Sequence, residues 1–207
     1  MELKKEIRAF NFEVRAEQDE DHGSIITGQP IVFNEPTDIG WYKEIIADGA
    51  LDDTDLRDVR FLVNHNTDMI PLARSRNNNA NSTMQLSVVP GSGLTIRVDL
   101  DTENNAEAKS LYSAVSRGDI TGMSFMYTVD GDAWDDLDSD YPTRTITNIS
   151  RVFEVSAVTF PAYEATSIQA RGLADALESA KASLESAKAE RRQIERKKQK
   201  IRILSEV

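Results

Sequence analysis

The apolar residues of this 207-residue chain follow two different periods, and this change limits the folds that the chain can adopt. Up to Tyr163, short β-branched runs alternate with glycine, proline and polar clusters, which is typical of strands joined by turns. Beyond Tyr163, the segment LESAKAS (residues 177–183) is followed by LESAKAE (184–190), and this seven-residue step is typical of a coiled-coil helix. The sequence therefore predicts a domain over residues 1–163 and a helical tail over residues 164–207.

Several segments of the first domain carry local signals for particular elements. Residues 24–34 are rich in β-branched side chains and predict a strand, and residues 86–100 alternate about a Pro-Gly-Ser-Gly turn, which predicts a hairpin. Residues 105–117 place apolar side chains at helical spacing, and Gly118 follows as a helix stop. Residues 130–140 contain six acidic residues and predict a solvated loop. The pattern as a whole is that of an α+β protein made mainly of strands.

The charge of the chain is divided unevenly between these two parts. The first 163 residues hold 14 basic and 28 acidic residues, a net charge of −14, whereas the last 44 hold 10 basic and 7 acidic residues, a net charge of +3. An acidic body argues against nucleic acid as a partner. Residues 1–8 lack the apolar run of a signal peptide, and no stretch approaches the ~18 apolar residues of a membrane span, so we expect no membrane partner.

The chain has no cysteine and only two histidines, which narrows the chemistry open to it. Disulfides, thiolate catalysis and cysteine-based zinc sites are excluded. The separated histidines and scattered carboxylates form no metal-ligand pattern, so we expect no metal and no cofactor. A serine nucleophile would need a histidine base. His65 ends an apolar, strand-like run over residues 59–66, whereas His22 lies in an acidic turn, so His65 is the candidate base.

Ser124 is the candidate nucleophile. It lies in the segment ITGMSF, residues 120–125, on a strand face next to Gly122, where a peptide backbone could approach closely. The alternative for Ser124 is a polar residue on the outer face of a half-buried strand. The alternative for His65 is a hydrogen-bonded histidine at a strand edge. Either residue, taken alone, is more often structural than catalytic.

Glu154 lies in an apolar segment, residues 152–160, that predicts a central strand. A carboxylate in such a strand is unfavourable unless it is paired or hydrogen-bonded. Arg144 or Arg151 could supply a purely structural partner. Pairing with His65 is the functional alternative, because a carboxylate can orient an imidazole that takes a proton from a serine.

A set of ordered segments around these residues resembles one group of viral enzymes. The segments are GQPIVFN (28–34), EIIADGAL (44–51), FLVNHN (61–66), LARS (72–75), GLTIRVDLD (93–101), GDITGMSF (118–125) and EVSAVTFPAY (154–163). Each segment alone is weak, but their order and spacing are similar to those of the prohead maturation proteases of tailed bacteriophages, which resemble the herpesvirus assemblin proteases distantly in fold. The resemblance covers residues 28–163.

The resemblance implies a serine endopeptidase with a compact, β-barrel-like domain flanked by helices. Ser124 would be the nucleophile, His65 the general base and Glu154 the third member of a triad. Such enzymes act inside the immature head, in the host cytoplasm, on the major capsid protein precursor or a scaffold protein, and commonly on themselves. The other function open to the chain is that of a non-catalytic scaffolding or head-assembly protein that keeps the protease fold.

Two positions depart from the family pattern. Met126 stands where the family usually has glycine, which could narrow the substrate groove, and Tyr163 stands where it usually has asparagine. Pro161 has no N–H group, so the backbone amide of Ala162 or Tyr163 is the candidate oxyanion-hole donor in this closing segment.

The end of the tail is strongly basic. Residues 191–202 carry seven basic side chains and one acidic side chain. The simplest interpretation is a solvated helix face. The alternatives are a helix that docks the protein to a scaffold domain, associates with a second copy of the chain, or is removed by self-cleavage.

Overall fold

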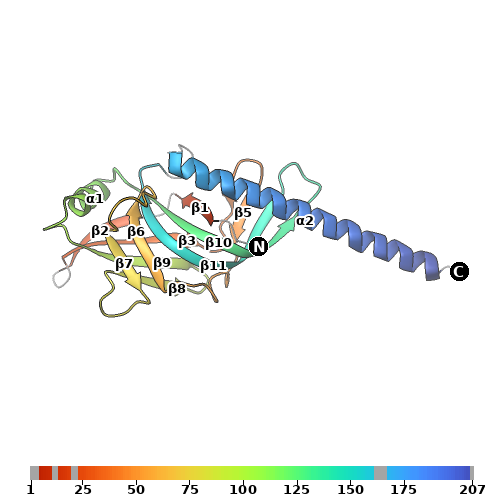
Figure 1. Cartoon of the computed structure of the whole chain (residues 1–207), viewed down its shortest axis with the longest axis horizontal. Coiled ribbons are helices and arrows are strands. Elements are labelled where there is room, and N and C mark those ends of the chain that lie inside the picture. The colour runs from red at the N-terminus through yellow and green to blue at the C-terminus, as the bar shows by residue number, and fades with distance from the viewer. Residues whose placement is uncertain (1–4, 11–13, 20–22, 161–166, 206–207) are drawn as a thin grey trace.

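The computed structural model describes residues 5–10, 14–19, 23–160 and 167–205 (Figure 1). Within these residues the chain forms a β-rich body from which one long helix extends. The elements in chain order are β1 (Lys5–Phe10), β2 (Val14–Asp19), β3 (Gly23–Val32), β4 (Thr37–Asp38), β5 (Lys43–Ile46), β6 (Asp58–Val63), β7 (Ala73–Arg76), β8 (Met84–Val89), β9 (Gly93–Leu100), α1 (Ala106–Ser116), β10 (Gly122–Asp135), β11 (Thr143–Val158) and α2 (Ser167–Ser205).

The strands form two sheets. The first has the order β1-β10-β11-β5-β4, and β6 and β7 extend it from the second half of β11. The long strand β11 makes this possible, because its residues 143–146 pair in parallel with β5 and its residues 154–157 pair in parallel with β6. The other edge of β11 pairs with β10 in antiparallel. The second sheet is antiparallel throughout, with the order β2-β3-β9-β8.

Side chains from both sheets and from α1 form one hydrophobic core. Ile26 and Val98 of the second sheet belong to the same buried cluster as Phe125 and Val155 of the first. α1 contributes three buried side chains to this cluster, which are Ala108, Leu111 and Val115. Each large apolar side chain buried in this way contributes about 1.5–3 kcal/mol. The core therefore fixes the first sheet, which carries the candidate site, against the rest of the body.

The prediction of a mainly β protein is confirmed, since more of the described residues lie in strands than in the two helices. The barrel-like character is not confirmed. Strand β1 ends the first sheet and β2 and β8 end the second, and no pairing between described strands joins the two sheets into a closed barrel. The described part of the body is thus two sheets that share a core.

The local predictions for the strand, the hairpin and the first helix are confirmed. β3 covers most of residues 24–34, and β8 and β9 form the predicted hairpin. α1 begins after Asn105, whose side chain accepts hydrogen bonds from the backbone N–H groups of Glu107 and Ala108. Such an N-cap satisfies donors that a helix leaves unpaired. The helix stops at Gly118, which has a positive φ of 77° that glycine adopts without strain.

The prediction of a loop over residues 130–140 is wrong for its first half. β10 continues to Asp135, and Trp134 in this stretch is buried. Asp132 does not need water to stabilise its charge, because its carboxylate accepts hydrogen bonds from Arg144 at 2.7 Å and from Ser183 of α2 at 2.6 Å. Arg144 and Ser183 lie 12 and 51 positions from Asp132, outside the segment, and the composition of the segment alone does not indicate them.

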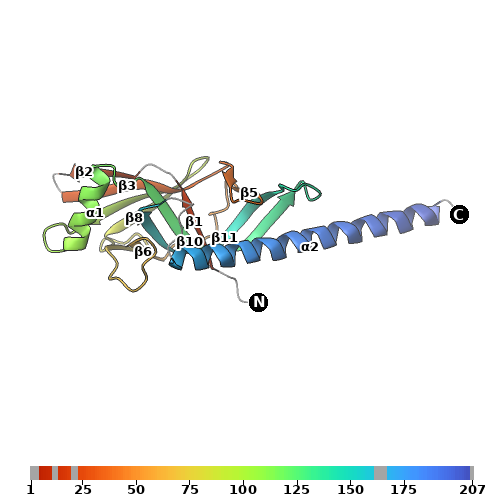
Figure 2. The same cartoon turned by 90° about the horizontal axis from the view of Figure 1, so that it is seen from above.

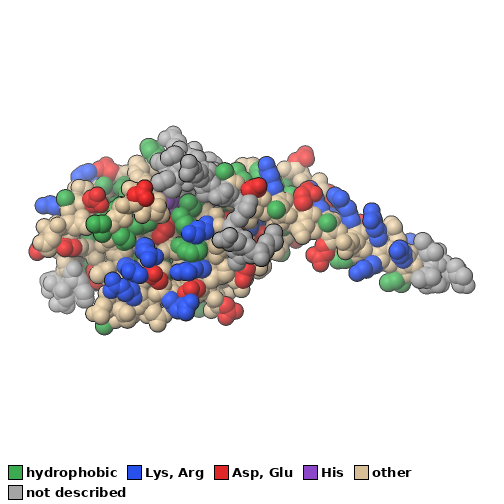
Figure 3. Space-filling view, in the orientation of Figure 1, with side chains coloured by type: hydrophobic (Ala, Val, Ile, Leu, Met, Phe, Trp, Pro, Cys, Tyr) green, Lys and Arg blue, Asp and Glu red, His purple; other side chains and the backbone are tan. Residues whose placement is uncertain are grey.

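α2 confirms the predicted helical tail, and its first half packs on the body (Figure 2). Ala180 and Leu184 are buried in a cluster with Tyr42 and Trp134. The apolar face of the seven-residue repeat therefore contacts the protein's own body at these positions, and pairing with another helix stays a prediction. Residues 191–202 are exposed, and Arg191 still pairs with Asp138 of the turn between β10 and β11. The end of the helix extends beyond the body, and its surface carries Lys and Arg side chains (Figure 3).

A buried network of charges joins β1 to β5 and β11. Arg8 of β1 donates hydrogen bonds to Glu44 at 2.5 and 2.7 Å, and Arg144 donates to Glu6 at 2.9 Å and to Asp132 at 2.7 Å. Burial raises the pKa of the Glu44 carboxyl, but the guanidinium groups of Arg8 and Arg144 outweigh this effect and hold the pKa below its usual value. Glu44 therefore stays ionised, and each charge in the network depends on its partners.

Arg144→Met is expected to lower the free energy of unfolding by about 3–5 kcal/mol, because Glu6, Glu44 and Asp132 each lose a buried charged partner. Urea unfolding measures the change. Arg191→Met is the control, since the pair between Arg191 and Asp138 is exposed and should contribute little. Equal losses in the two variants would contradict a stabilising role for the network.

Candidate active site

Ser124 lies near the start of β10 with its side chain fully buried. It stands opposite Ser156 of β11 on one side and opposite Ala9 of β1 on the other. Side chains directly opposite each other in an antiparallel pair lie on the same face of the sheet, so Ser124 and Ser156 face the same space. Glu154 is two residues from Ser156 along β11, and its side chain therefore lies on this face as well.

His65 reaches this face from the turn after β6. β6 ends at Val63, and both Asn64 and His65 adopt left-handed backbone conformations, with φ of 52° and 55°. Non-glycine residues rarely adopt this conformation, and the surrounding structure must support it. Asn64 provides support, because its Oδ1 accepts a hydrogen bond from the Thr159 N–H at 2.9 Å and its Nδ2 donates to the Thr159 hydroxyl at 3.0 Å. The backbone strain is thus located at the residue that carries the imidazole.

The structure brings the three predicted residues into contact. The His65 Nε2 lies 2.5 Å from the Ser124 Oγ, and the His65 Nδ1 lies 2.5 Å from the Glu154 Oε1. The side chain of His65 is fully buried and that of Glu154 is 3% exposed, so little water competes for these contacts. An ionised Glu154 only accepts hydrogen bonds, which places a proton on Nδ1 and leaves Nε2 able to take a proton from the serine.

The arginines considered as structural partners of Glu154 pair elsewhere. Arg144 belongs to the buried network of charges, and the Arg151 Nε lies 3.8 Å from the carboxylate of Asp55. The partner of Glu154 is therefore His65, as in the functional alternative, and its carboxylate lies where it can stabilise an imidazolium.

Ser156 is a member of this network that the sequence analysis did not single out. Its hydroxyl donates a hydrogen bond to the Glu154 Oε2 at 2.6 Å and accepts one from the His65 backbone N–H at 3.1 Å. One buried side chain thus fixes both the carboxylate and the backbone that carries the imidazole. The signal in the sequence was a serine two residues after Glu154, since this spacing places both side chains on one face of a strand.

Ser156→Ala is expected to lower kcat by about ten- to a hundredfold with little change in KM, because His65 and Glu154 lose the group that holds them in register. Steady-state kinetics on a peptide substrate measures the two constants separately. Ser150→Ala is the matched control, since Ser150 lies on the same strand and bonds to Thr128, away from the site. A loss that appears only as lower thermal stability, with kcat unchanged, would contradict the positioning role.

β1 closes the site along the edge of β10. The Ser124 Oγ donates a hydrogen bond to the backbone carbonyl of Arg8 at 2.6 Å, within a ladder that pairs residues 5–10 with residues 123–128. A hydroxyl has one proton, so while Ser124 donates it to this carbonyl, Ser124 does not donate it to the His65 Nε2. The serine is therefore both shielded from solvent and engaged by β1 in this arrangement.

Two predictions fall outside the described residues. The candidate oxyanion-hole amides of Ala162 and Tyr163 lie between β11 and α2, beyond the last described residue of that connection, Phe160. His22, the histidine rejected as a base, also lies outside the described part. The oxyanion-hole assignment stays a prediction.

The model of the caudovirus prohead serine protease family matches residues 10–180 of the chain. The chain belongs to this family. The matched region includes Ser124, His65 and Glu154, and the family's description indicates a serine peptidase of capsid maturation. No curated protein and no solved structure matches the prohead protease. Among its described helices, none is long and apolar enough to cross a membrane.

Proposed function

We propose that this prohead protease is a serine endopeptidase that cleaves the major capsid protein precursor or a scaffold protein inside the immature head, and that it also cleaves its own chain. The buried contacts from Ser124 through His65 to Glu154 carry the proposal, because this arrangement activates a serine hydroxyl. The family match supports the same chemistry.

In the proposed reaction, the Ser124 Oγ attacks the carbonyl carbon of the scissile peptide bond while the His65 Nε2 takes the hydroxyl proton. Glu154 stabilises the resulting imidazolium through Nδ1–H. The C–N bond breaks as His65 donates the proton to the leaving amine, and an acyl ester remains on Ser124. A water molecule that His65 deprotonates then hydrolyses the ester. The backbone amides of Ala162 and Tyr163 are the proposed oxyanion donors.

The closed state of the site supports self-processing. A substrate cannot reach Ser124 while β1 lies against it, so β1 must unpair from β10 or be cut before the enzyme acts on another protein. Glu6 and Arg8 hold β1 through the buried network, and this attachment would delay activity after synthesis. The segment after Tyr163 is a second proposed cutting site, because cleavage there would release the enzyme from its helical tail.

The projecting end of α2 supports docking as the role of the tail. Residues 191–202 are basic, the end of the helix extends beyond the body, and Ile194 and Ile201 are 46% and 67% exposed. A helix of this kind suits pairing with an acidic amphipathic helix of a scaffold protein. A basic docking helix would also suit a non-catalytic head-assembly protein. The tail therefore does not distinguish a protease from such a protein.

The test is incubation of the full-length protein with the purified capsid precursor and scaffold protein of its phage, followed by intact-mass spectrometry. We expect the wild type to cut at least one precursor and to shorten itself, and Ser124→Ala to leave every chain intact. Ser150→Ala, which removes a hydroxyl away from the site, should behave as the wild type does. Identical intact masses for the wild type and Ser124→Ala would favour the assembly role instead.

A further inference from the structure

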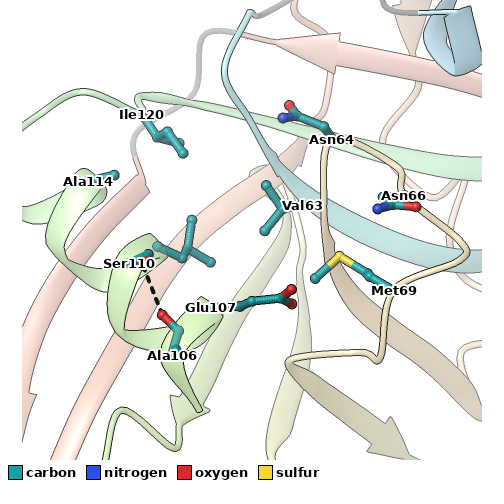
Figure 4. A pocket seen from close by; sticks show the side chains of 10 residues that line it. Val63, Asn64, Asn66, Met69, Ala106, Glu107, Ser110, Ala114 and Ile120 are labelled. Carbon is teal, nitrogen blue, oxygen red and sulfur yellow. Dashed lines mark hydrogen bonds between the residues drawn. The ribbon is translucent and has the colours of Figure 1, made fainter.

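A cleft of about 560 Å3 lies between α1 and the turn after β6 (Figure 4). One wall is the end of β6 and the following turn, which contribute Val63 and Met69. The other wall is α1, which contributes Ser110 and Leu111. The volume lies within the range of pockets that receive small ligands, and it exceeds that of any single amino-acid side chain.

Two features connect the cleft with the catalytic residues. Asn64 and Asn66 line the cleft and are the chain neighbours of His65 on either side. Ile120, at another part of the lining, precedes Ser124 by four residues. The cleft thus adjoins the turn that carries His65, while His65, Ser124 and Glu154 themselves do not line it.

β1 indicates how an extended peptide lies along this edge of β10. The Arg8 carbonyl is at the Ser124 Oγ, and the last pair of the ladder joins Phe10 to Met123, so β1 runs from Ser124 toward the start of β10. Addition of a strand to a sheet edge is a common mode of peptide recognition. A substrate that replaces β1 in the same direction carries its leaving-group residues toward Ile120 and the cleft.

The lining of the cleft is mainly apolar. Val63 and Met69 are half-buried, and Leu111 and Ile120 are buried. An apolar side chain that enters between them removes apolar surface from water on both sides, and the flexible Met69 can adapt to its shape. Glu107 reaches across the cleft from α1 in Figure 4, and its carboxylate disfavours an acidic side chain.

We propose that this cleft is a specificity subsite for a large apolar side chain, such as Leu, Met or Phe, on the leaving-group side of the scissile bond. The proposal rests on the proposed function, because it requires a peptide that is cut at Ser124. It assigns substrate selection to α1 and to the turn after β6, with Met69, Leu111 and Ile120 as the residues that contact the substrate side chain.

The test uses peptides built on a mapped cleavage site, with Leu, Ala or Asp at each of the first three positions after the scissile bond. We expect one position at which the full-length enzyme cuts the Leu peptide with a kcat/KM at least about tenfold above that of the Ala and Asp peptides. Ser110→Trp places a ring at the exposed cleft wall and should reduce this preference to about that of Ala. Lys109 precedes Ser110 on α1 and does not line the cleft, so Lys109→Trp is the matched control and should keep the preference.

Labelling of Ser124 by a fluorophosphonate probe separates failure of the subsite from failure of the protease, because the probe carries no peptide on the leaving-group side. Normal labelling of Ser110→Trp together with loss of the Leu preference supports the subsite. Normal labelling and cleavage by the wild type without any preference at the three positions overturn the subsite alone. Absence of both labelling and cleavage in the wild type overturns the protease and the subsite together.

Discussion

Replacing Ser124 with alanine is expected to lower kcat/KM for peptide cleavage by about five to six powers of ten. The substitution removes the atom that forms the acyl ester and leaves only substrate binding and oxyanion stabilisation. His65→Ala is expected to fall to a similar level, because the hydroxyl then loses the base that lies 2.5 Å from it. Steady-state rates on a peptide with a mapped cleavage site, at high enzyme concentration, measure both losses.

The double variant Ser124→Ala/His65→Ala should be no more than about threefold slower than either single variant, because the two residues act as one unit. Thermal unfolding of each variant shows whether it is folded under the conditions of the assay. Losses that multiply in the double variant would mean that the residues act independently, which contradicts the proposed triad.

Glu154→Gln is expected to lower kcat by about four powers of ten and to leave KM within about threefold of the wild type. The amide keeps the shape of the side chain, and its oxygen can still accept the hydrogen bond that Ser156 donates. It carries no charge to stabilise the imidazolium, and its N–H group can face the His65 Nδ1 and impose the wrong tautomer. Measuring kcat and KM separately distinguishes this loss from weaker substrate binding.

Glu103→Gln is the control for this substitution, since it makes the same chemical change in an exposed residue of the turn before α1. It should leave kcat unchanged. A triad carboxylate is expected to give a much larger loss. If Glu154→Gln also changes kcat by less than about tenfold, Glu154 is a structural residue. The third member of the triad would then lie elsewhere.

The sequence predicts those parts of the fold that depend on neighbouring residues. Asn105 and Gly118 mark the two ends of α1 because a cap and a stop act within one helical turn. Alternation over residues 86–100 predicts the hairpin because facing strands are joined by a short turn. The continuous apolar run around Glu154 predicts a central strand, and β11 does pair with strands on both of its edges.

The candidate site could be predicted only in part. Two histidines leave few choices of base, and a carboxylate in a central strand requires a partner, but the assignment of Ser124, His65 and Glu154 as a triad came from the resemblance of the surrounding segments to prohead proteases. The contact of Ser156 with the His65 backbone depends on a left-handed turn and joins residues 91 positions apart. The contact between Ser124 and the Arg8 carbonyl joins residues 116 positions apart. Pairings of this kind are set by the tertiary fold, and no local pattern encodes them.

Covalent labelling tests most directly whether Ser124 is a nucleophile activated by His65. The wild type after self-processing, and His65→Ala that a trace of wild type has cut to the same mass, are treated with a fluorophosphonate probe, and tryptic mass spectrometry locates the adduct. We predict an adduct on the peptide that contains Ser124 in the wild type and none on that peptide in His65→Ala. A wild type that is unlabelled at Ser124, or a His65→Ala variant labelled there equally fast, would contradict the proposed active site.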